Sequence, residues 1–241
     1  MSFTHFIEHY RAILVGIAFV TIFLWEQVFP QRRFQYLFQH NLINFAYGFL
    51  NLFITFAGGY FFSNYLDYFQ PYHIFWNIHT ETWVRLLVAF LIADALMYWW
   101  HRFNHTFPFL WNFHSFHHED GMMNSTTAIR FHFVELIFSY IFRMIFYPLF
   151  GISSTALLVF STVHFIMIIF HHSNVYMSPR FDRIIRYVIT TPGMHRIHHS
   201  NRWVETNSNY TSILSLWDFV FRSYKKEPVN EITFGIPKGQ P

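Results

Sequence analysis

Residues 94–118 read DALMYWWHRFNHTFPFLWNFHSFHH, so the end of an apolar run leads directly into two histidine patterns. The patterns HxxxH and HxxHH contribute His101, His105, His114, His117 and His118. Positions i, i+3 and i+4 lie on one face of an α-helix, so each pattern presents its imidazoles in one direction. The stretch therefore predicts a helix that leaves an apolar layer and ends beside a group of imidazoles.

The HxxHH pattern occurs a second time, at His195, His198 and His199. Eight clustered imidazoles would repel one another if protonated and would leave lone pairs unsatisfied if neutral, unless metal ions bind them. Imidazole suits iron, zinc, copper and nickel, and eight ligands exceed the needs of one ion, so we expect two ions. Five of the other histidines are isolated in the sequence and are expected to be structural or interfacial: His5, His9, His40, His73 and His79.

The composition favours a membrane protein. Of 241 residues, 53% are apolar and 12% are charged, whereas a soluble domain has roughly 25% charged residues. The mean hydropathy of +0.23 is low for a membrane protein because 17 histidines and 14 tyrosines lower it. There are no cysteines, which excludes disulfides, thiolate zinc sites, iron–sulfur clusters and cysteine nucleophiles.

Five apolar stretches are candidate membrane spans, and a spanning helix needs about 20 residues. They are Tyr10–Val28, Ile43–Phe62, Val84–Trp100, Phe133–Phe150 and Thr155–Phe170. The last three are at or below the short end of the required length. The fourth and fifth are closely joined, which predicts a helical hairpin that need not cross fully. The first is too long, and too lacking in a small-residue cleavage site, for a signal peptide. The aromatic segment between Tyr65 and Trp83 is expected at the membrane interface.

We therefore expect a single domain over residues 1–241 with an all-α fold. It would be a polytopic helical bundle with about four to five membrane-embedded helices and a histidine-rich helical cap. The alternative interpretation is a soluble all-α protein in which these stretches are buried core helices.

The basic residues are distributed unevenly about these spans. If the chain crosses at each stretch, Arg11 and Arg85 fall on one side, and Arg143 is undecided. The other side receives thirteen: Arg32, Arg33, Arg102, Arg130, Arg180, Arg183, Arg186, Arg196, Arg202, Arg222, Lys225, Lys226 and Lys238. The positive-inside rule makes that side cytoplasmic, in a cell inner membrane or the endoplasmic reticulum. The histidine-rich segments 101–118 and 171–199 fall on the same side.

Six runs together resemble a known superfamily. They read DALMYWWHRFNH, LWNFHSFHH, NSTTAIRFHFVE, HHSN, HRIHHS and NYTSILSLWDFVFRSY. The chain is similar to the fatty acid hydroxylase and sterol desaturase superfamily, particularly the branch that includes alkylglycerol monooxygenase and many bacterial sterol-desaturase-like proteins. The resemblance covers about residues 84–224. It departs from the family pattern at Thr211, where glycine is frequent, and at the closing FRSY, where FGTY is frequent.

The resemblance implies an oxidoreductase with a non-haem centre of two iron ions. Such enzymes use O2 and electrons to hydroxylate or desaturate a membrane lipid, such as a fatty acyl, alkyl-ether or sterol chain. The eight motif histidines would be metal ligands, and the family's HSN motif adds His172 as a ninth. His171 competes with it, and His164 is a further possible ligand. Zinc can substitute for iron on purification.

The implied partners follow from the same resemblance. No haem-binding cytochrome motif is fused to the chain, so the electrons would come from a separate reductase or from a cytochrome or ferredoxin donor. No nucleic-acid partner is expected.

Several polar residues are candidates to support the ligands. Asp94 lies on one helical stripe with His101 and His105, so it is expected to accept from a ligand imidazole. The alternative is an ion pair with Arg102 or Arg130. His132, with Glu135 one turn later, is expected beside the ligands or in the wall of the site. Asn124, Arg130, Asn207, Asn209 and Asp218 are expected to order the cap, and Trp111, Trp203 and Trp217 to pack.

Two rival functions remain open. A zinc hydrolase usually carries its ligands and general base as HExxH, and no histidine follows His118 and Glu119 at the required spacing. A metal-binding or transport protein usually places its ligands near the bilayer midplane on broken helices, whereas these clusters lie beyond the helix ends. The sequence therefore favours oxidation over both.

Overall fold

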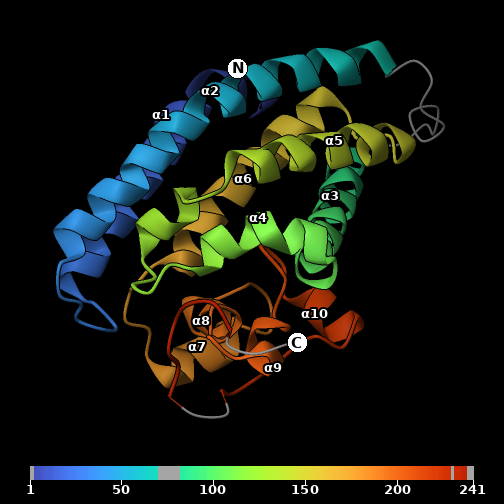
Figure 1. The fold of residues 1–241 in the computed structure, drawn as a ribbon. Coiled ribbons are helices and arrows are strands. Elements are labelled where there is room, and N and C mark those ends of the chain that lie inside the picture. The colour runs from blue at the N-terminus through green and yellow to red at the C-terminus, as the bar shows by residue number, and fades with distance from the viewer. Residues whose placement is uncertain (1–2, 70–81, 229–230, 238–241) are drawn as a thin grey trace.

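The computed structural model describes residues 3–69, 82–228 and 231–237, and these residues are helical with isolated β-bridges (Figure 1). The helices are α1 (Phe3–Val28), α2 (Leu37–Phe69), α3 (Thr82–Thr106), α4 (Pro108–His118), the 3₁₀ helix η3 (Ser125–Ile129), α5 (Phe133–Leu149), α6 (Ser154–His172), α7 (Pro179–Ile185), α8 (Pro192–His198), α9 (Trp203–Thr206) and α10 (Leu216–Val220). The predicted all-α fold is confirmed. Most of the predicted interfacial segment, 70–81, lies outside the described residues.

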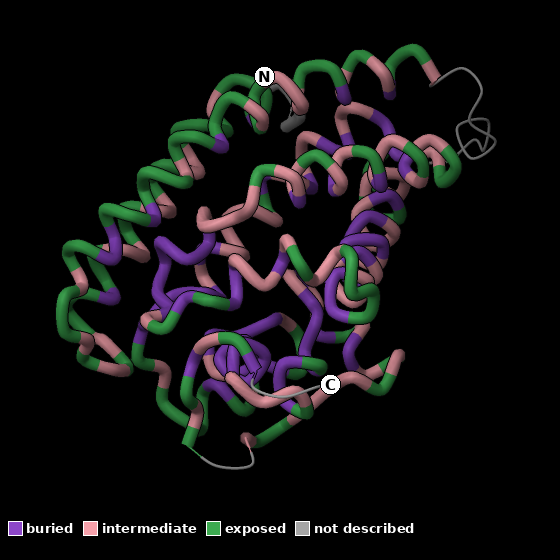
Figure 2. Tube along the Cα trace, viewed as in Figure 1, coloured by how far each residue is buried: buried purple, intermediate pink, exposed green. Residues whose placement is uncertain are grey.

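Four helices are long and apolar enough to cross a membrane: Phe6–Val28 within α1, and the whole of α2, α3 and α6. Large apolar side chains on α1 and α2 face outward, and Phe53 is 79% exposed (Figure 2). A soluble protein rarely exposes so large an apolar surface, whereas lipid would cover it. The chain is therefore an integral membrane protein, and the soluble alternative is wrong.

The fourth predicted stretch forms α5, which has 17 residues and contains Pro148. It is shorter than the four spanning helices. It begins beside α4, where the ring of His132 contacts that of Phe113. The chain turns at Gly151, which has a φ of 67°, and returns through α6, which ends at His172. The two helices thus leave the histidine-rich end of the molecule and come back to it, as the hairpin prediction expected.

Aromatic and small side chains form the core between α2, α3, α5 and α6. Phe62, Ala93, Tyr147 and Phe160 are almost fully buried there. Helices α2 and α5 approach closely at Gly58, because a Cβ atom built there would lie 2.6 Å from Cε2 of Tyr140. This packing fixes the axes along which α3 and α6 deliver their histidines to the site.

The cap contains α7 to α10 and is ordered by buried polar side chains. The Asp218 carboxylate accepts hydrogen bonds from the backbone N–H groups of Tyr210 and Thr211, at 2.9 and 3.1 Å, and from two hydroxyls. The Asn209 side chain donates to the carbonyls of Met194 and Lys225. Both residues therefore hold the cap together, as the sequence suggested.

Candidate metal centre

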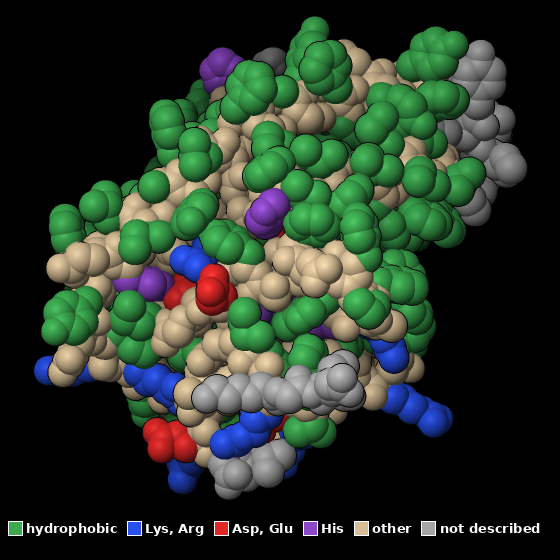
Figure 3. Space-filling view, in the orientation of Figure 1, with side chains coloured by type: hydrophobic (Ala, Val, Ile, Leu, Met, Phe, Trp, Pro, Cys, Tyr) green, Lys and Arg blue, Asp and Glu red, His purple; other side chains and the backbone are tan. Residues whose placement is uncertain are grey.

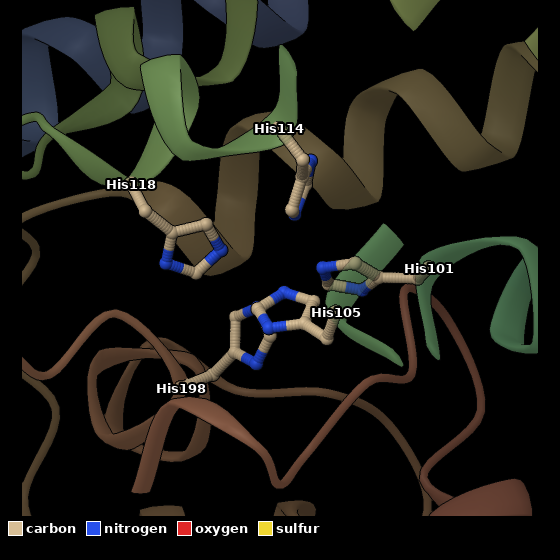
Figure 4. Close-up of side chains that lie close together, drawn as sticks. All are labelled: His101, His105, His114, His118 and His198. Carbon is tan, nitrogen blue, oxygen red and sulfur yellow. The ribbon is translucent and has the colours of Figure 1, made fainter. Parts of the chain in front are cut away.

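Nine histidines, eight from four helices and one from the residue after α8, meet at the junction of the spans and the cap and form two groups. Within each group the nearest ring nitrogens lie within 4.8 Å of one another. The first group contains His101, His105, His114, His118 and His198 (Figure 4). The second contains His117, His172, His195 and His199. The nine are the eight motif histidines and His172.

Each HxxHH motif contributes to both groups. Helix α4 gives His114 and His118 to the first group and His117 to the second. The second motif, on α8 and the residue after it, divides the other way. His198 joins the first group, and His195 and His199 join the second. Adjacent residues on a helix point about 100° apart, so a neighbouring pair of histidines can face two different centres. The paired histidines therefore explain how two short helices serve two sites.

Burial favours the neutral form of several of these rings. His118, His198 and His199 are fully buried. Burial, with the neighbouring His199 ring, holds the pKa of His118 well below its usual range. Burial, with the His117 ring, does the same to the pKa of His199. Neutral imidazole is the form that binds a metal ion, so these rings are prepared for ligation at ordinary pH.

Backbone carbonyls determine which nitrogen of several rings faces the site. The Nδ1 atoms of His101 and His198 lie 2.7 Å from the carbonyl oxygens of Tyr210 and Ser208. Those of His117 and His172 lie 3.0 and 2.8 Å from the carbonyls of Arg130 and Ile168. A carbonyl only accepts, so each Nδ1 carries the proton and each Nε2 presents a lone pair to the site.

This tautomer leaves lone pairs facing one another. Nε2 of His172 lies 2.9 Å from Nε2 of His117 and 3.0 Å from Nε2 of His195. Because His117 and His172 carry their protons on Nδ1, their two Nε2 atoms cannot hydrogen-bond to each other. In the first group, Nε2 of His114 and His198 is buried without a hydrogen-bond partner among the described residues. Converging lone pairs shielded from water are the arrangement that a bound cation stabilises, so the residues fit a metal pair.

The structure distinguishes the three candidates on α6. His172 joins the second group, whereas His171 and His164 belong to neither. The Nδ1 atom of His171 donates to the carbonyl of Ser212 at 3.1 Å, and its ring lies 4.1 Å from that of His195. His164 stacks on Phe160 at 5.1 Å. His171 therefore packs behind the second group, and His164 lies about two turns further into the span.

Asp94 was expected either to accept from a ligand imidazole or to pair with Arg102 or Arg130, and both expectations are wrong. Its Oδ2 accepts from the backbone N–H of Leu214 at 3.1 Å and from the indole N–H of Trp217 at 2.9 Å, rather than from an imidazole or an arginine. Asp94 lies seven residues before His101, which is about 10 Å along a helix axis, so it falls beyond reach of that ring. The cap folds back along α3 and uses this carboxylate as an anchor.

Glu135 is the carboxylate that contacts a histidine of the first group. Its Oε1 lies 2.8 Å from Nδ1 of His114, and both side chains are buried. In the sequence, the one indication of a role for Glu135 is its position one helical turn after His132. The two partners are 21 residues apart and meet because α5 packs on α4.

His132 and Asn124 order the chain around the site without touching a histidine of either group among the described residues. His132 caps α5, because its Nδ1 accepts from the backbone N–H of Val134 at 3.2 Å. Asn124 caps η3 and donates to the Asn41 side chain at 2.8 Å. His132 thus caps α5, and its ring contacts Phe113 and Phe116 of α4.

A buried polar network that no local sequence pattern predicts joins α2 to the loop after α4. His40 Nε2 lies 2.6 Å from Oδ1 of Asp120, and Thr127 donates to Oδ2 at 2.7 Å. Burial alone would raise the pKa of Asp120, but the hydrogen bonds from His40 and Thr127 bring it below its usual range. His40 and Asp120 are 80 residues apart, so no local pattern connects them. The network ties α2 to the loop that follows His118.

A bundle of membrane helices that ends in two groups of imidazoles defines a membrane protein with a histidine-rich site that could bind metal. The sequence comparison agrees with this class. The fatty acid hydroxylase family model matches residues 86–223. The chain therefore belongs to the fatty acid hydroxylase family, as the resemblance suggested.

Individual relatives are similar at a low level of identity. The chain is 29% identical over 154 residues to the ornithine lipid hydroxylase OlsE of Rhizobium tropici, covering 64% of this chain and 46% of that protein. It is 28% identical over 183 residues to alkylglycerol monooxygenase of Danio rerio, covering 72% of this chain and 37% of the relative. The matched region thus spans less than half of the length of these relatives. No solved structure matches the chain.

Proposed function

We propose that this protein is a membrane-bound di-iron oxidoreductase that uses O2 and external electrons to oxidise a membrane lipid. The observation that carries the proposal is the convergence of nine imidazoles in two groups. Histidine-only ligation without thiolates or haem suits non-haem iron. Family membership supports a lipid as the substrate, and two relatives are named a lipid hydroxylase and an alkylglycerol monooxygenase. Hydroxylation is therefore favoured over desaturation.

In this proposal each histidine group holds one ion. The first is held by His101, His105, His114, His118 and His198, and the second by His117, His172, His195 and His199. Two bound iron ions would supply the activation of O2 that oxidation of an unactivated C–H bond requires. Zinc would occupy the same imidazoles if it replaced iron during purification.

The protein's own groups orient the ligands and exclude water. Backbone carbonyls hold the Nδ1 proton on four rings, and Glu135 holds His114. Helices α3 and α6 carry ligands at their cap ends, so a lipid chain in the bilayer could approach the site along them. The site would face the cytoplasm, where the basic segments are expected, and electrons would arrive there from a separate donor.

The test is reconstitution with ferrous iron, membrane lipid and a reducing system under oxygen-18 gas. The expected result is oxygen-18 in the lipid or in its cleavage product, detected by mass spectrometry. A new double bond without label would replace hydroxylation by desaturation. Turnover that continues unchanged without O2 would refute oxidation and revive the metal-dependent hydrolase. The His118→Ala variant is the matched control and should yield no labelled lipid.

A further inference from the structure

Two tryptophans connect the first histidine group with the surface of the cap. The Trp111 ring on α4 lies 5.0 Å from the ring of His105 and 5.3 Å from that of His118, measured between centroids. Trp203, the first residue of α9, lies 5.4 Å from Trp111. Both indoles are partly exposed. An unbroken series of aromatic rings therefore runs from two candidate ligands to the surface.

The surface around Trp203 has accessible positive charge. Arg202 precedes Trp203 and is partly exposed, and the Lys225 ammonium donates to the carbonyl of Val204 at 3.4 Å. The nearby carboxylate of Glu205 is fully buried, 3.7 Å from the Arg202 guanidinium. The acid is thus withdrawn from the surface, where it pairs with Arg202, while the Arg202 and Lys225 side chains remain partly exposed.

The same asymmetry holds across the described part of the cap. Asp182, Glu205 and Asp218 are buried, which leaves Glu227 and Glu231 as the exposed acids within the described residues after Val175. The basic side chains that are exposed or partly exposed are Arg180, Arg183, Arg202, Arg222, Lys225 and Lys226. Most of the Lys and Arg side chains visible in Figure 3 lie in the lower part of the molecule, below the apolar surface of the spans. A field of one sign raises the encounter rate of a partner of opposite charge.

We propose that the Trp203 face, defined as Arg202, Trp203, Val204 and Lys225, docks an acidic, soluble one-electron carrier protein. Trp203 and Trp111 then bridge electron transfer from this carrier to the first histidine group. Tunnelling weakens steeply with distance, so two rings in contact provide a favourable path to His105 and His118. Helix α9 lies in the cap, away from the exposed apolar faces of α1 and α2, which favours a soluble partner over a bilayer (Figure 1).

The inference rests on the proposed iron centre. Each transfer would move one electron from the carrier to an iron ion held by the first histidine group, and the two indoles would end unchanged. One hydroxylation consumes O2, two electrons and two protons: one oxygen atom enters the C–H bond and the other leaves as water. The carrier must therefore dock twice per turnover, which makes a fast, charge-steered encounter useful.

The test follows the reduction of bound ferric iron without O2 or lipid, by absorbance and electron paramagnetic resonance. The probes are a reduced, acidic plant-type [2Fe–2S] ferredoxin and, separately, dithionite. Trp203→Leu should slow reduction by saturating ferredoxin several-fold, leave dithionite reduction and iron content unchanged, and be rescued by Trp203→Phe. Trp25→Leu is the matched control, because Trp25 is 46% exposed on α1.

The docking surface is tested by reversing one charge. Lys225→Glu should lower the second-order rate with ferredoxin by about tenfold at low ionic strength, and salt should remove the difference. Arg33→Glu, an exposed residue between α1 and α2 with the same change in charge, should have a much smaller effect.

Three outcomes would overturn the inference. Equal ferredoxin rates for Trp203→Leu and the wild type would exclude the path, and equal slowing with dithionite would indicate damage to the iron site. Loss by Lys225→Glu of binding to phosphatidylglycerol vesicles, with an unchanged ferredoxin rate, would assign the face to the bilayer. Failure of the wild type to hold reducible iron would instead refute the proposed function itself.

Discussion

At the scale of single residues, the site depends on which nitrogen of each ring carries the proton. Four rings donate from Nδ1 to backbone carbonyls, which no side-chain substitution removes directly. His114 is different because its Nδ1 partner is the Glu135 side chain. An outer carboxylate orients a ligand imidazole and increases its basicity. Glu135 is therefore the point where a substitution can change ligation without removing a ligand.

Glu135→Ala is expected to lower the affinity of the first site for metal by about 10–100-fold, because His114 loses its partner. Equilibrium competition with a chelator measures the affinity, and circular dichroism checks that the helices remain. Glu231→Ala, which removes an exposed acid, is the control. Equal affinities for the wild type and Glu135→Ala would contradict the role of Glu135.

The adjacent histidines at the end of α6 should differ in effect. His172→Ala removes a lone pair from the second group, so this variant should lose metal from one site. His171→Ala should keep both ions, because His171 belongs to neither group. Metal analysis of the two purified variants makes the comparison. Loss of an ion from His171→Ala alone would reverse the assignment.

At the scale of helices, the site depends on how closely α2 packs on α5. The aromatic ring of Tyr140 lies against the backbone at Gly58, and its hydroxyl donates to the carbonyl of Thr55 at 3.0 Å. A methyl group at Gly58 would have to displace the Tyr140 ring, which is also held by the hydrogen bond from its hydroxyl to Thr55. At Gly59 the nearest atom to a new Cβ is the Tyr140 hydroxyl, at 3.9 Å. The two neighbouring glycines therefore form a matched pair for testing the packing.

Gly58→Ala is expected to destabilise the bundle by about 1–3 kcal/mol, as overpacking does in other cores. Gly59→Ala should be neutral or slightly stabilising, because alanine favours helix more than glycine does. Thermal unfolding in detergent, compared under identical conditions, measures the difference. Equal stability of the two variants would show that α2 and α5 are not packed as described.

Local patterns predicted the elements better than their contacts. The apolar stretches predicted the helices, and the HxxHH spacing predicted that imidazoles would gather at their ends. The division of the nine rings into five and four depends on the relative rotation of α4 and α8, which sequence spacing does not determine. Pairs such as Glu135 with His114, or His40 with Asp120, form only when distant segments pack. A shared helical stripe does not bring Asp94 within reach of the imidazoles, and its carboxylate instead binds Leu214 and Trp217 of the cap.

At the scale of the whole molecule, charge distribution predicts orientation in the membrane. Thirteen basic residues fall on one side of the predicted spans, and the positive-inside rule predicts that this side is cytoplasmic. Helices α3 and α6 end in the histidine groups, so orientation also determines which compartment can deliver electrons. The proposed soluble carrier can therefore reach the site only if the cap lies in the same compartment as the carrier.

A reporter fused after Tyr224 should be active in the cytoplasm, since the cap belongs to the basic side. A second fusion in the segment between α2 and α3 should report the opposite side. The location of each fusion is measured with two reporters, one active only in the cytoplasm and one active only outside it. Activity of the Tyr224 fusion outside the cytoplasm would invert the orientation and remove the cytosolic route for electrons.

The claim that two groups of imidazoles hold two ions is tested most directly by counting transition-metal ions per chain in fully loaded protein. Mass spectrometry of the metal content, with protein quantified by amino-acid analysis, gives the number. The wild type is predicted to hold two ions. His118→Ala and His199→Ala each remove a ligand from a different group, so each variant is predicted to hold one ion. A fully loaded wild-type chain with one ion or fewer would contradict the two-ion centre.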